Sequence, residues 1–264
     1  MITVYVLNET PRNEELAEQI QRILTEAMPA VEKVTGLPLP DNGTVDLVDP
    51  EGLSRAWCAF LRRQLARDTA GLDLTNRQQR WISAMPEGAR MATRRFWKSE
   101  ISTLIANSAG RPSTLLIPEA LDLQGLTAPD QLCELLVYAL AQQAQVAACD
   151  GNLVPPPAWP QVRASRNVVS LLSTGHAQWT SDQATPLIFG KSVTRDQRRS
   201  PLKAALSVLA LGSSRQEARA KALVGQAMSA VGPDTFNRVW SVAGLVPTLD
   251  ELRDPARWIK RLPA

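Results

Sequence analysis

The segment Leu135–Gln145 reads LLVYALAQQAQ and lies within a longer apolar stretch over residues 129–148. The turn-forming sequence Asp150-Gly151-Asn152 follows that stretch and is typical of the end of a helix. A spacing of four residues places Tyr138 and Gln142 on the same helix face. The sequence therefore predicts a helix over 129–148 that is mostly apolar but carries a polar pair on one face.

The segments before this helix mix strand and helix patterns. Residues 2–6, 44–48 and 114–117 are rich in β-branched and aliphatic side chains and are predicted to form three short strands of one small sheet. Helical spacing of apolar residues predicts helices over 13–34 and 50–67. In the first of these, Pro29 is expected to kink or end the helix early. Residues 69–99 are predicted to be helical, with a break near Pro86-Glu87-Gly88.

The segments after residue 150 are predicted to be helical. The expected helices cover 167–185, ending before Pro186, then 201–211 and 214–231, separated by Gly212-Ser213, with short closing segments at 234–242 and 255–261. The predicted class is therefore α+β, mainly α, with a small N-terminal sheet followed by a helical C-terminal part. We expect one domain over residues 1–264, with approximate lobes at 1–150 and 151–264.

Composition limits the classes of function. The 264 residues are 44% hydrophobic and carry a formal net charge of +3, which is too small a surplus to indicate nucleic-acid binding. No apolar run reaches the roughly 18 residues of a membrane span, and Met1–Leu7 lacks the features of a signal peptide. Cys58, Cys133 and Cys149 have no metal-binding spacing. These features favour a reduced, cytoplasmic protein that contacts neither a membrane nor a nucleic acid.

Several segments together resemble one known family. The helix around Leu135–Gln145 resembles the active-site helix of bacterial zincin-like metallopeptidases of the gluzincin type, whose pattern is Leu-Val-His-Glu-Leu-x-His-x-Ala-Gln. The segment Thr174–Trp179, TGHAQW, is similar to the family's Glu-Gly-His-Ala segment. The tail is similar to the family's closing segment at Phe236–Trp240, Leu245–Leu252 and Asp254–Trp258. The resemblance covers Thr114–Arg261 and implies a zincin-like fold.

The resemblance also implies that the metal site is lost. In that family two histidines one helical turn apart and a glutamate from the next helix hold Zn²⁺, and a second glutamate polarises the bound water. This chain has Tyr138 and Gln142 at the histidine positions, Thr174 at the third-ligand position and Ala139 at the water-polarising position. None of these is a normal zinc ligand. We therefore expect no cofactor, no metal ligand and no zinc peptidase activity.

Two interpretations of the polar residues follow. In the first, Tyr138, Gln142, Glu134 and Gln145 form a stripe that faces solvent. In the second, a remnant cleft binds a ligand through six residues: Tyr138, Gln142, Thr174, His176, Glu134 and Trp179. His176, the only histidine, is expected either to have a local structural partner or to act as a general base.

Two functions are therefore predicted. The first is a pseudopeptidase that binds a protein or peptide, or regulates an active relative. The alternative is a repurposed, metal-free enzyme that uses the remnant cleft on a small molecule or peptide.

Overall fold

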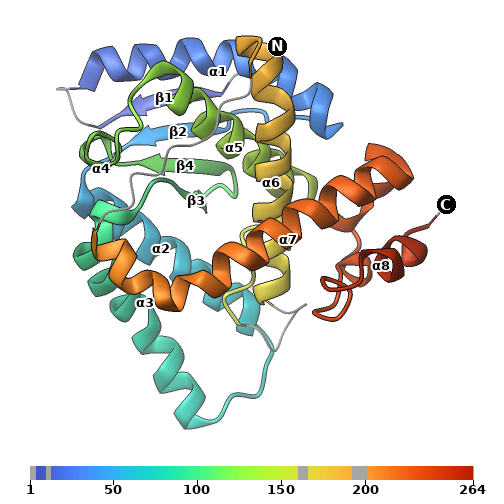
Figure 1. The fold of residues 1–264 in the computed structure, drawn as a ribbon. Helices are drawn as coiled ribbons and strands as arrows, with labels where there is room; N and C mark the ends of the chain where they lie inside the picture. The colour runs from blue at the N-terminus through green and yellow to red at the C-terminus, as the bar shows by residue number, and fades with distance from the viewer. Residues whose placement is uncertain (1–3, 10–12, 160–165, 192–200, 264) are drawn as a thin grey trace.

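A four-stranded sheet is packed between helices on one side of the protein, away from α8 (Figure 1). The structure is a computed structural model that describes residues 4–9, 13–159, 166–191 and 201–263, with residues 166–167 and 201–214 described by their backbone alone. The predicted α+β, mainly helical class is confirmed. The helices are α1 (Glu14–Thr35), α2 (Pro50–Thr69), α3 (Asn76–Phe96), α4 (Pro118–Gln124), α5 (Pro129–Ala148), α6 (Arg166–Phe189), α7 (Pro201–Asn237) and α8 (Pro255–Arg261).

The sheet has the strand order β1-β2-β4-β3. Its strands are β1 (Tyr5–Asn8), β2 (Thr44–Leu47), β3 (Thr103–Ala106) and β4 (Pro112–Leu116). β1, β2 and β4 are parallel, whereas β3 pairs antiparallel with β4 and forms one edge. The three predicted strands are present with small shifts of their ends, and β3 was missed.

Helices cover both faces of the sheet. The side chains of each strand alternate between the two faces, so each strand contributes to the packing on both. On one face, Leu47 and Leu116 join the main hydrophobic core with residues of α1, α5 and α6. On the other face, Leu115 and Ile105 pack with residues of α2 such as Phe60. The main core runs from Val4 to Leu262, so both predicted lobes contribute to it.

The predicted helix over 129–148 is confirmed as α5, the most buried helix of the structure. It begins with Pro129 at its first turn, where the missing N–H costs nothing. It packs against α1, α6 and β4. Because it is enclosed on most sides, its few polar side chains must find partners inside the protein.

α6 and α7 cross in direct backbone contact at Gly175. A Cβ atom at this position would lie 2.6 Å from the carbonyl carbon of Ala220 and 2.8 Å from the backbone nitrogen of Lys221. Any side chain would therefore force the two helices apart. Gly175 separates Thr174 from His176, so this contact fixes the helix that carries both.

The predicted break near Pro86 and the predicted helix end before Pro186 were wrong, and α1 does not end at Pro29. Pro29, Pro86 and Pro186 lie inside α1, α3 and α6. Each helix continues because residues beyond the proline still pack: Val31, Ala89 and Ile188 all contact a hydrophobic cluster. Such packing offsets the local cost of the proline.

The predicted separation at Gly212-Ser213 was also wrong, because α7 is helical there. α7 breaks instead at Gly232, whose φ of 76° is outside the helical region. Within the part of the chain that the structure describes, no helix combines the length and apolar character needed to cross a membrane.

Candidate functional site

A small cavity lies at the antiparallel edge of the sheet, between α5 and α6. Its volume is about 200 Å³. α5 contributes Tyr138 and Gln142, and α6 contributes Ser170, Ser173 and Thr174. The remaining walls come from Trp57 of α2, Ser102 and Leu104 at β3, and Val154, Pro155 and Pro156 of the α5–α6 connector. The described lining includes no carboxylate, ammonium, guanidinium or imidazole group.

The structure brings together three of the six predicted cleft residues: Tyr138, Gln142 and Thr174. The Gln142 side-chain amide donates a hydrogen bond to the Tyr138 hydroxyl at 3.3 Å, as their spacing on one helix face allows. Both side chains are half-buried, and Gln145 is fully buried. The stripe as a whole therefore does not face solvent, because Gln145 is enclosed and the other members are half-buried.

The last turn of α2 holds the connector between α5 and α6, which forms one wall of the cavity. The Asp68 carboxylate is buried and accepts hydrogen bonds from the backbone N–H groups of Ala158, at 2.6 Å, and Trp159, at 3.4 Å. The Arg67 guanidinium pairs with Asp68 at 3.0 Å and donates to the carbonyl oxygen of Gly151 at 2.6 Å. These two neighbouring residues thus fix both ends of the segment that includes the Val154–Pro156 wall.

We expect Asp68→Ala to lower the free energy of unfolding by about 2–3 kcal/mol, because two buried backbone donors lose a charged acceptor. Asp68→Asn keeps one acceptor oxygen and should lose less than half as much. Urea denaturation of the three proteins measures the difference. Equal losses in both variants, or no loss in either, would contradict this role of Asp68.

His176 does not line the cavity, contrary to the predicted cleft set. Its side chain is completely buried, and its Nδ1 lies 2.8 Å from Nε2 of Gln145. Gln145 also bonds Ser173, whose hydroxyl donates to the Gln145 side-chain oxygen at 2.6 Å. Since the Gln145 amide N–H donates to Nδ1, the neutral imidazole carries its proton on Nε2.

Aromatic rings enclose His176. Phe236 stacks on the imidazole at a centroid distance of 5.4 Å, and Trp240 meets it edge-on at 5.4 Å. Burial in this apolar surrounding lowers the pKa of His176 to about 3. The imidazole is therefore neutral near pH 7, and its partner and position are those of a structural histidine rather than a general base on the cavity.

Glu134 and Trp179 also lie outside the cavity. The Glu134 carboxylate accepts a hydrogen bond from the Ser181 hydroxyl at 3.1 Å, which ties α5 to α6. The Trp179 indole lies against Gly225 of α7, where an added Cβ would be 3.2 Å from the ring. Glu134 thus contacts α6 and Trp179 contacts α7, and neither side chain lines the cavity.

Sequence reasoning missed most of the other lining residues. Trp57, Ser102 and Leu104 lie far from α5 in sequence, and no local motif marks them. The Val154–Pro156 segment belongs to the connector between α5 and α6. The Ser173 hydroxyl, also in the lining, donates to the Gln145 side-chain oxygen.

The donor set of the described residues does not fit a zinc ion. No group of three or more His, Cys, Asp or Glu side chains gathers where a metal could be held, within residues 4–9, 13–159, 166–191 and 201–263. At the mapped ligand positions stand a phenol, an amide and a hydroxyl, all poor zinc donors.

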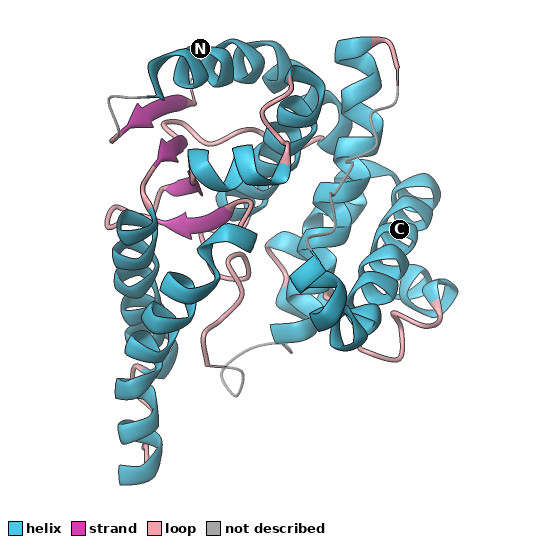
Figure 2. Cartoon of the chain, turned by 60° about the vertical axis from the view of Figure 1, so that its left-hand side comes forward, coloured by secondary structure: helices cyan, strands magenta, loops and turns pink. Residues whose placement is uncertain are grey.

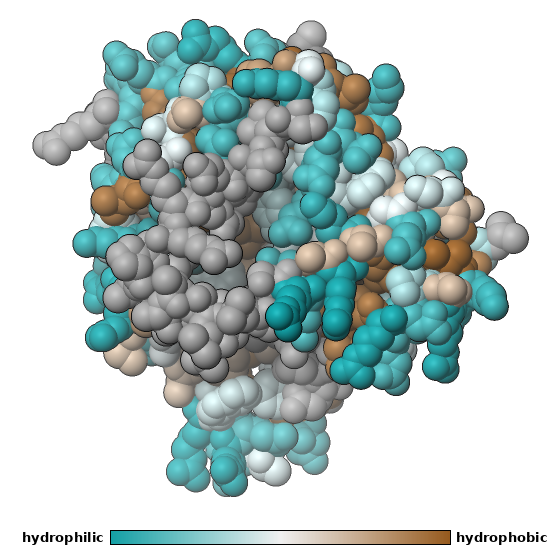
Figure 3. Space-filling model, in the orientation of Figure 1, coloured by the Kyte–Doolittle hydropathy of each residue, from teal (hydrophilic) through white to brown (hydrophobic). Residues whose placement is uncertain are grey.

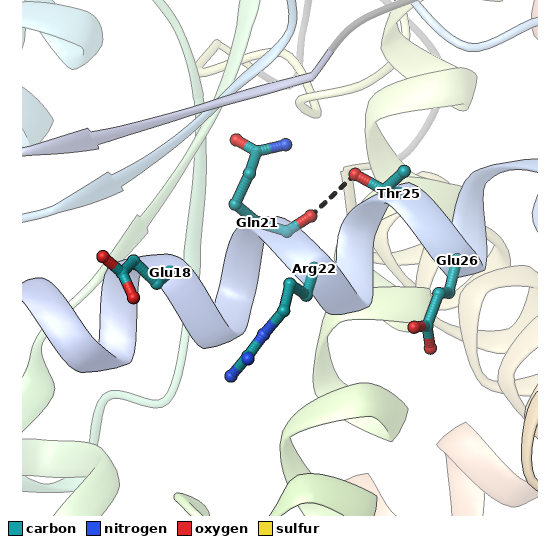
Figure 4. A pocket seen from close by; sticks show the side chains of 5 residues that line it. All are labelled: Glu18, Gln21, Arg22, Thr25 and Glu26. Carbon is teal, nitrogen blue, oxygen red and sulfur yellow. Dashed lines mark hydrogen bonds between the residues drawn. The ribbon is translucent and has the colours of Figure 1, made fainter.

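A second hollow, of about 500 Å³, lies over α1 (Figure 4). Its described lining consists of Glu18, Gln21, Arg22, Thr25 and Glu26, all from that helix. Gln21 anchors β1 by accepting from the N–H of Val6 and donating to the carbonyl oxygen of Val4, both at 3.2 Å. These side chains point in different directions along one helix (Figure 4), so they form no convergent site.

The tail that follows α7 is closed by an ion pair between Glu251 and Arg261. The guanidinium contacts the carboxylate through two bonds of 2.8 and 2.9 Å. The hydrogen bonds from Arg261 lower the pKa of Glu251 to about 2. Arg261 also donates to the carbonyl oxygen of Val246 at 2.9 Å. The conformation of the tail therefore depends on the residues that carry the sequence resemblance.

Comparison with known proteins agrees with the resemblance of the tail. Residues 190–259 match a family model described as zincin-like metallopeptidase. This match begins after α6, so it includes the tail but neither α5 nor the Thr174–Trp179 segment. The comparison with curated proteins gave no match.

One similar solved structure is a protein of Chloroflexus aurantiacus, provisionally named a hydrolase with a novel fold. It has a TM-score of 0.57 and 14% sequence identity, and the likeness covers 96% of this chain and 91% of that chain. At this identity the likeness is one of fold. Over residues 190–259, about a quarter of the chain, the protein is thus similar to the zincin-like metallopeptidases.

Proposed function

We propose that this protein is a catalytically inactive zincin-like metallopeptidase that binds an uncharged peptide segment in the cavity between α5 and α6. One observation supports this most: Tyr138, Gln142 and Thr174, the mapped ligand positions, line a single cavity in which no described side chain is charged. The mapped ligand positions lie together between α5 and α6, but they carry a phenol, an amide and a hydroxyl in place of two imidazoles and a carboxylate.

The loss of peptidase activity follows from the side chains. Zinc peptidases need imidazole or carboxylate ligands and a base beside the metal-bound water. Ala139, at the position of the base, has no group that accepts a proton. The single imidazole of the chain, His176, is buried on the far side of Gln145 among aromatic rings.

The chemistry of the cavity favours an uncharged ligand. A buried charge without a counter-ion is strongly disfavoured, and the described lining offers none. Hydroxyl groups and one amide can donate and accept hydrogen bonds, while Trp57, Leu104 and Pro155 provide apolar surface. β3 forms the open edge of the sheet beside the cavity, and an extended peptide backbone can bond to such an edge. These features favour a peptide over a small charged metabolite.

A peptide-display selection tests the proposal directly. Peptides selected on the wild-type protein are compared for binding to Thr174→Trp, which fills the cavity, and to Gln183→Trp, which adds the same side chain at an exposed position of α6. We expect Thr174→Trp to bind at least tenfold more weakly, a loss of about 1.4 kcal/mol or more. Gln183→Trp should bind like the wild type.

The selected peptides should also carry an uncharged residue at the position that inserts. Equal binding by both variants would refute the cavity as the binding site. Selection of peptides with an essential charged residue would refute the proposed ligand class.

The alternative, a metal-free enzyme, has weaker support from the geometry. Tyr138 is the one ionisable side chain in the described lining. The Ser173 hydroxyl donates to an amide oxygen, which is too weak a base to activate it. His176, the general base of that hypothesis, is separated from the cavity by Gln145.

A further inference from the structure

The outer face of α3 carries a regular stripe of exposed residues, one of which, Trp81, also packs against Trp159 at a ring-centroid distance of 5.4 Å. Its six residues are exposed and alternate at intervals of four and three: Arg77, Trp81, Ala84, Gly88, Met91 and Arg95. The Trp81 and Met91 side chains are 55% and 68% exposed. This spacing aligns residues along a helix and is the spacing by which two helices pack together. The opposite face, with Ile82 and Ala89, already packs against α2 and the connector.

Basic charge is concentrated on the same hairpin of α2 and α3. Residues 50–100 contain ten Lys and Arg against five Asp and Glu, a net charge of +5, whereas the whole chain carries +3. Arg90 and Arg94 share the carboxylate of Glu51, and Arg90 also pairs with Glu87 at 3.7 Å. Among the described residues, no carboxylate pairs with the cations at or beside the two ends of the stripe, namely Arg77, Arg80, Arg95 and Lys98.

The hairpin projects from the body of the protein (Figures 1 and 2). The beginning of α3 and the loop before it form the projecting end, which is largely hydrophilic in Figure 3. The six stripe residues are exposed in the described structure, so a second molecule can reach them.

Gly88 has no structural role within the described chain. It lies inside α3, where glycine is less favourable than alanine, and a Cβ atom there would meet nothing within 4 Å. Its φ is not in the left-handed region. A glycine that nothing in the fold requires is explained if another backbone approaches it closely.

We propose that this stripe is the docking surface for an acidic amphipathic helix of a partner protein, independently of the cavity. The small residues Ala84 and Gly88 let a second helix come near, and the exposed parts of Trp81 and Met91 provide apolar contacts. The cations at both ends, of which Arg95 and Lys98 lie over the rings of Phe96 and Trp97, attract acidic side chains. A second copy of this chain would bring like charges together. A membrane would find too little apolar area at the centre of the stripe. A nucleic acid would not use helix-packing spacing.

Site-specific photocrosslinking in the natural host tests this surface. A photoreactive benzoylphenylalanine replaces Ala84 in the full chain, and the matched control replaces Ser83, an exposed neighbour that points away from the stripe. We expect position 84 to give a protein adduct at least tenfold more abundant than position 83. The crosslinked residue should lie in a helical segment rich in Asp and Glu, and Arg77→Glu with Arg95→Glu should abolish the adduct.

A synthetic peptide of the crosslinked segment is then titrated against wild type, Gly88→Ala and Gly88→Leu. Gly88→Ala should raise the thermal midpoint by about 2 °C, while Gly88→Leu should weaken peptide binding at least tenfold with the fold intact by circular dichroism. No adduct at position 84, or an adduct with lipid, nucleic acid, a second copy or a non-acidic segment, would overturn the proposal. Unchanged binding by Gly88→Leu would overturn it as well.

Discussion

A variant with four restored side chains is expected to bind one Zn²⁺ per chain. The substitutions are Tyr138→His, Ala139→Glu, Gln142→His and Thr174→Glu. The first, third and fourth positions line the same cavity, so two imidazoles and a carboxylate would face one small volume, as a zinc site requires. Elemental analysis after dialysis against zinc measures the uptake, and the unmodified protein should take up none.

The triple variant without Ala139→Glu is the sharper form of this experiment. Ala139 is only 1% exposed, so a glutamate there adds a buried carboxylate and endangers the fold. Ala139 is also not a ligand position, and the triple variant should therefore retain zinc. The double variant that keeps Thr174 should hold zinc at least tenfold more weakly, because it lacks the third ligand. A folded triple variant without zinc would show that the mapping of α5 and α6 onto the family is wrong.

Acid should destabilise the protein through His176. Its pKa is lowered by burial to about 3, against an ordinary value of 6.5. Between these two values the unfolded chain binds a proton that the folded protein does not, so the free energy of unfolding decreases as the pH falls. The contribution is complete above pH 6.5 and is lost progressively towards pH 3. At about 1.4 kcal/mol for each pKa unit, the loss is on the order of 5 kcal/mol.

His176→Phe isolates this contribution. A phenyl ring preserves the stack on Phe236 and leaves Gln145 its bond to the carbonyl oxygen of Ser173 at 3.2 Å. Urea denaturation of both proteins at pH 7, 6, 5 and 4 measures the difference. The wild type should lose stability more steeply than the variant over this range, and two further measurements at pH 8 and 9 should give equal slopes for both proteins. Parallel curves at every pH would mean that the imidazole is accessible to protons in the folded protein.

The bounds of α5 and α8 could be predicted from local sequence signals. Each begins with a proline at its first turn and has turn-forming or extended residues after its end. β3 could not be predicted in the same way. Thr103–Ala106 is a strand through its pairing with β4, which no local pattern marks. The prolines inside helices were misjudged because tertiary packing on both sides of each one outweighs the local cost.

The candidate site was predictable only where one helix defines it. Tyr138 and Gln142 follow from a spacing of four, and Thr174 from the family pattern. The orientation of α6 about its own axis was not predictable. That orientation turns His176 towards Phe236 and leaves Thr174 on the cavity, and it depends on contacts with α7 that no local pattern encodes.

The backbone contact at Gly175 restricts how the cavity between α5 and α6 can change during evolution. Since α6 touches the backbone of α7 there, the helix can neither slide nor rotate without a clash. New ligand preferences among relatives should therefore arise by exchanging individual wall residues, with the glycine and the helix crossing retained. Divergence of that kind can replace a metal by a hydrogen-bonding surface in a few mutational steps and leave the backbone unchanged.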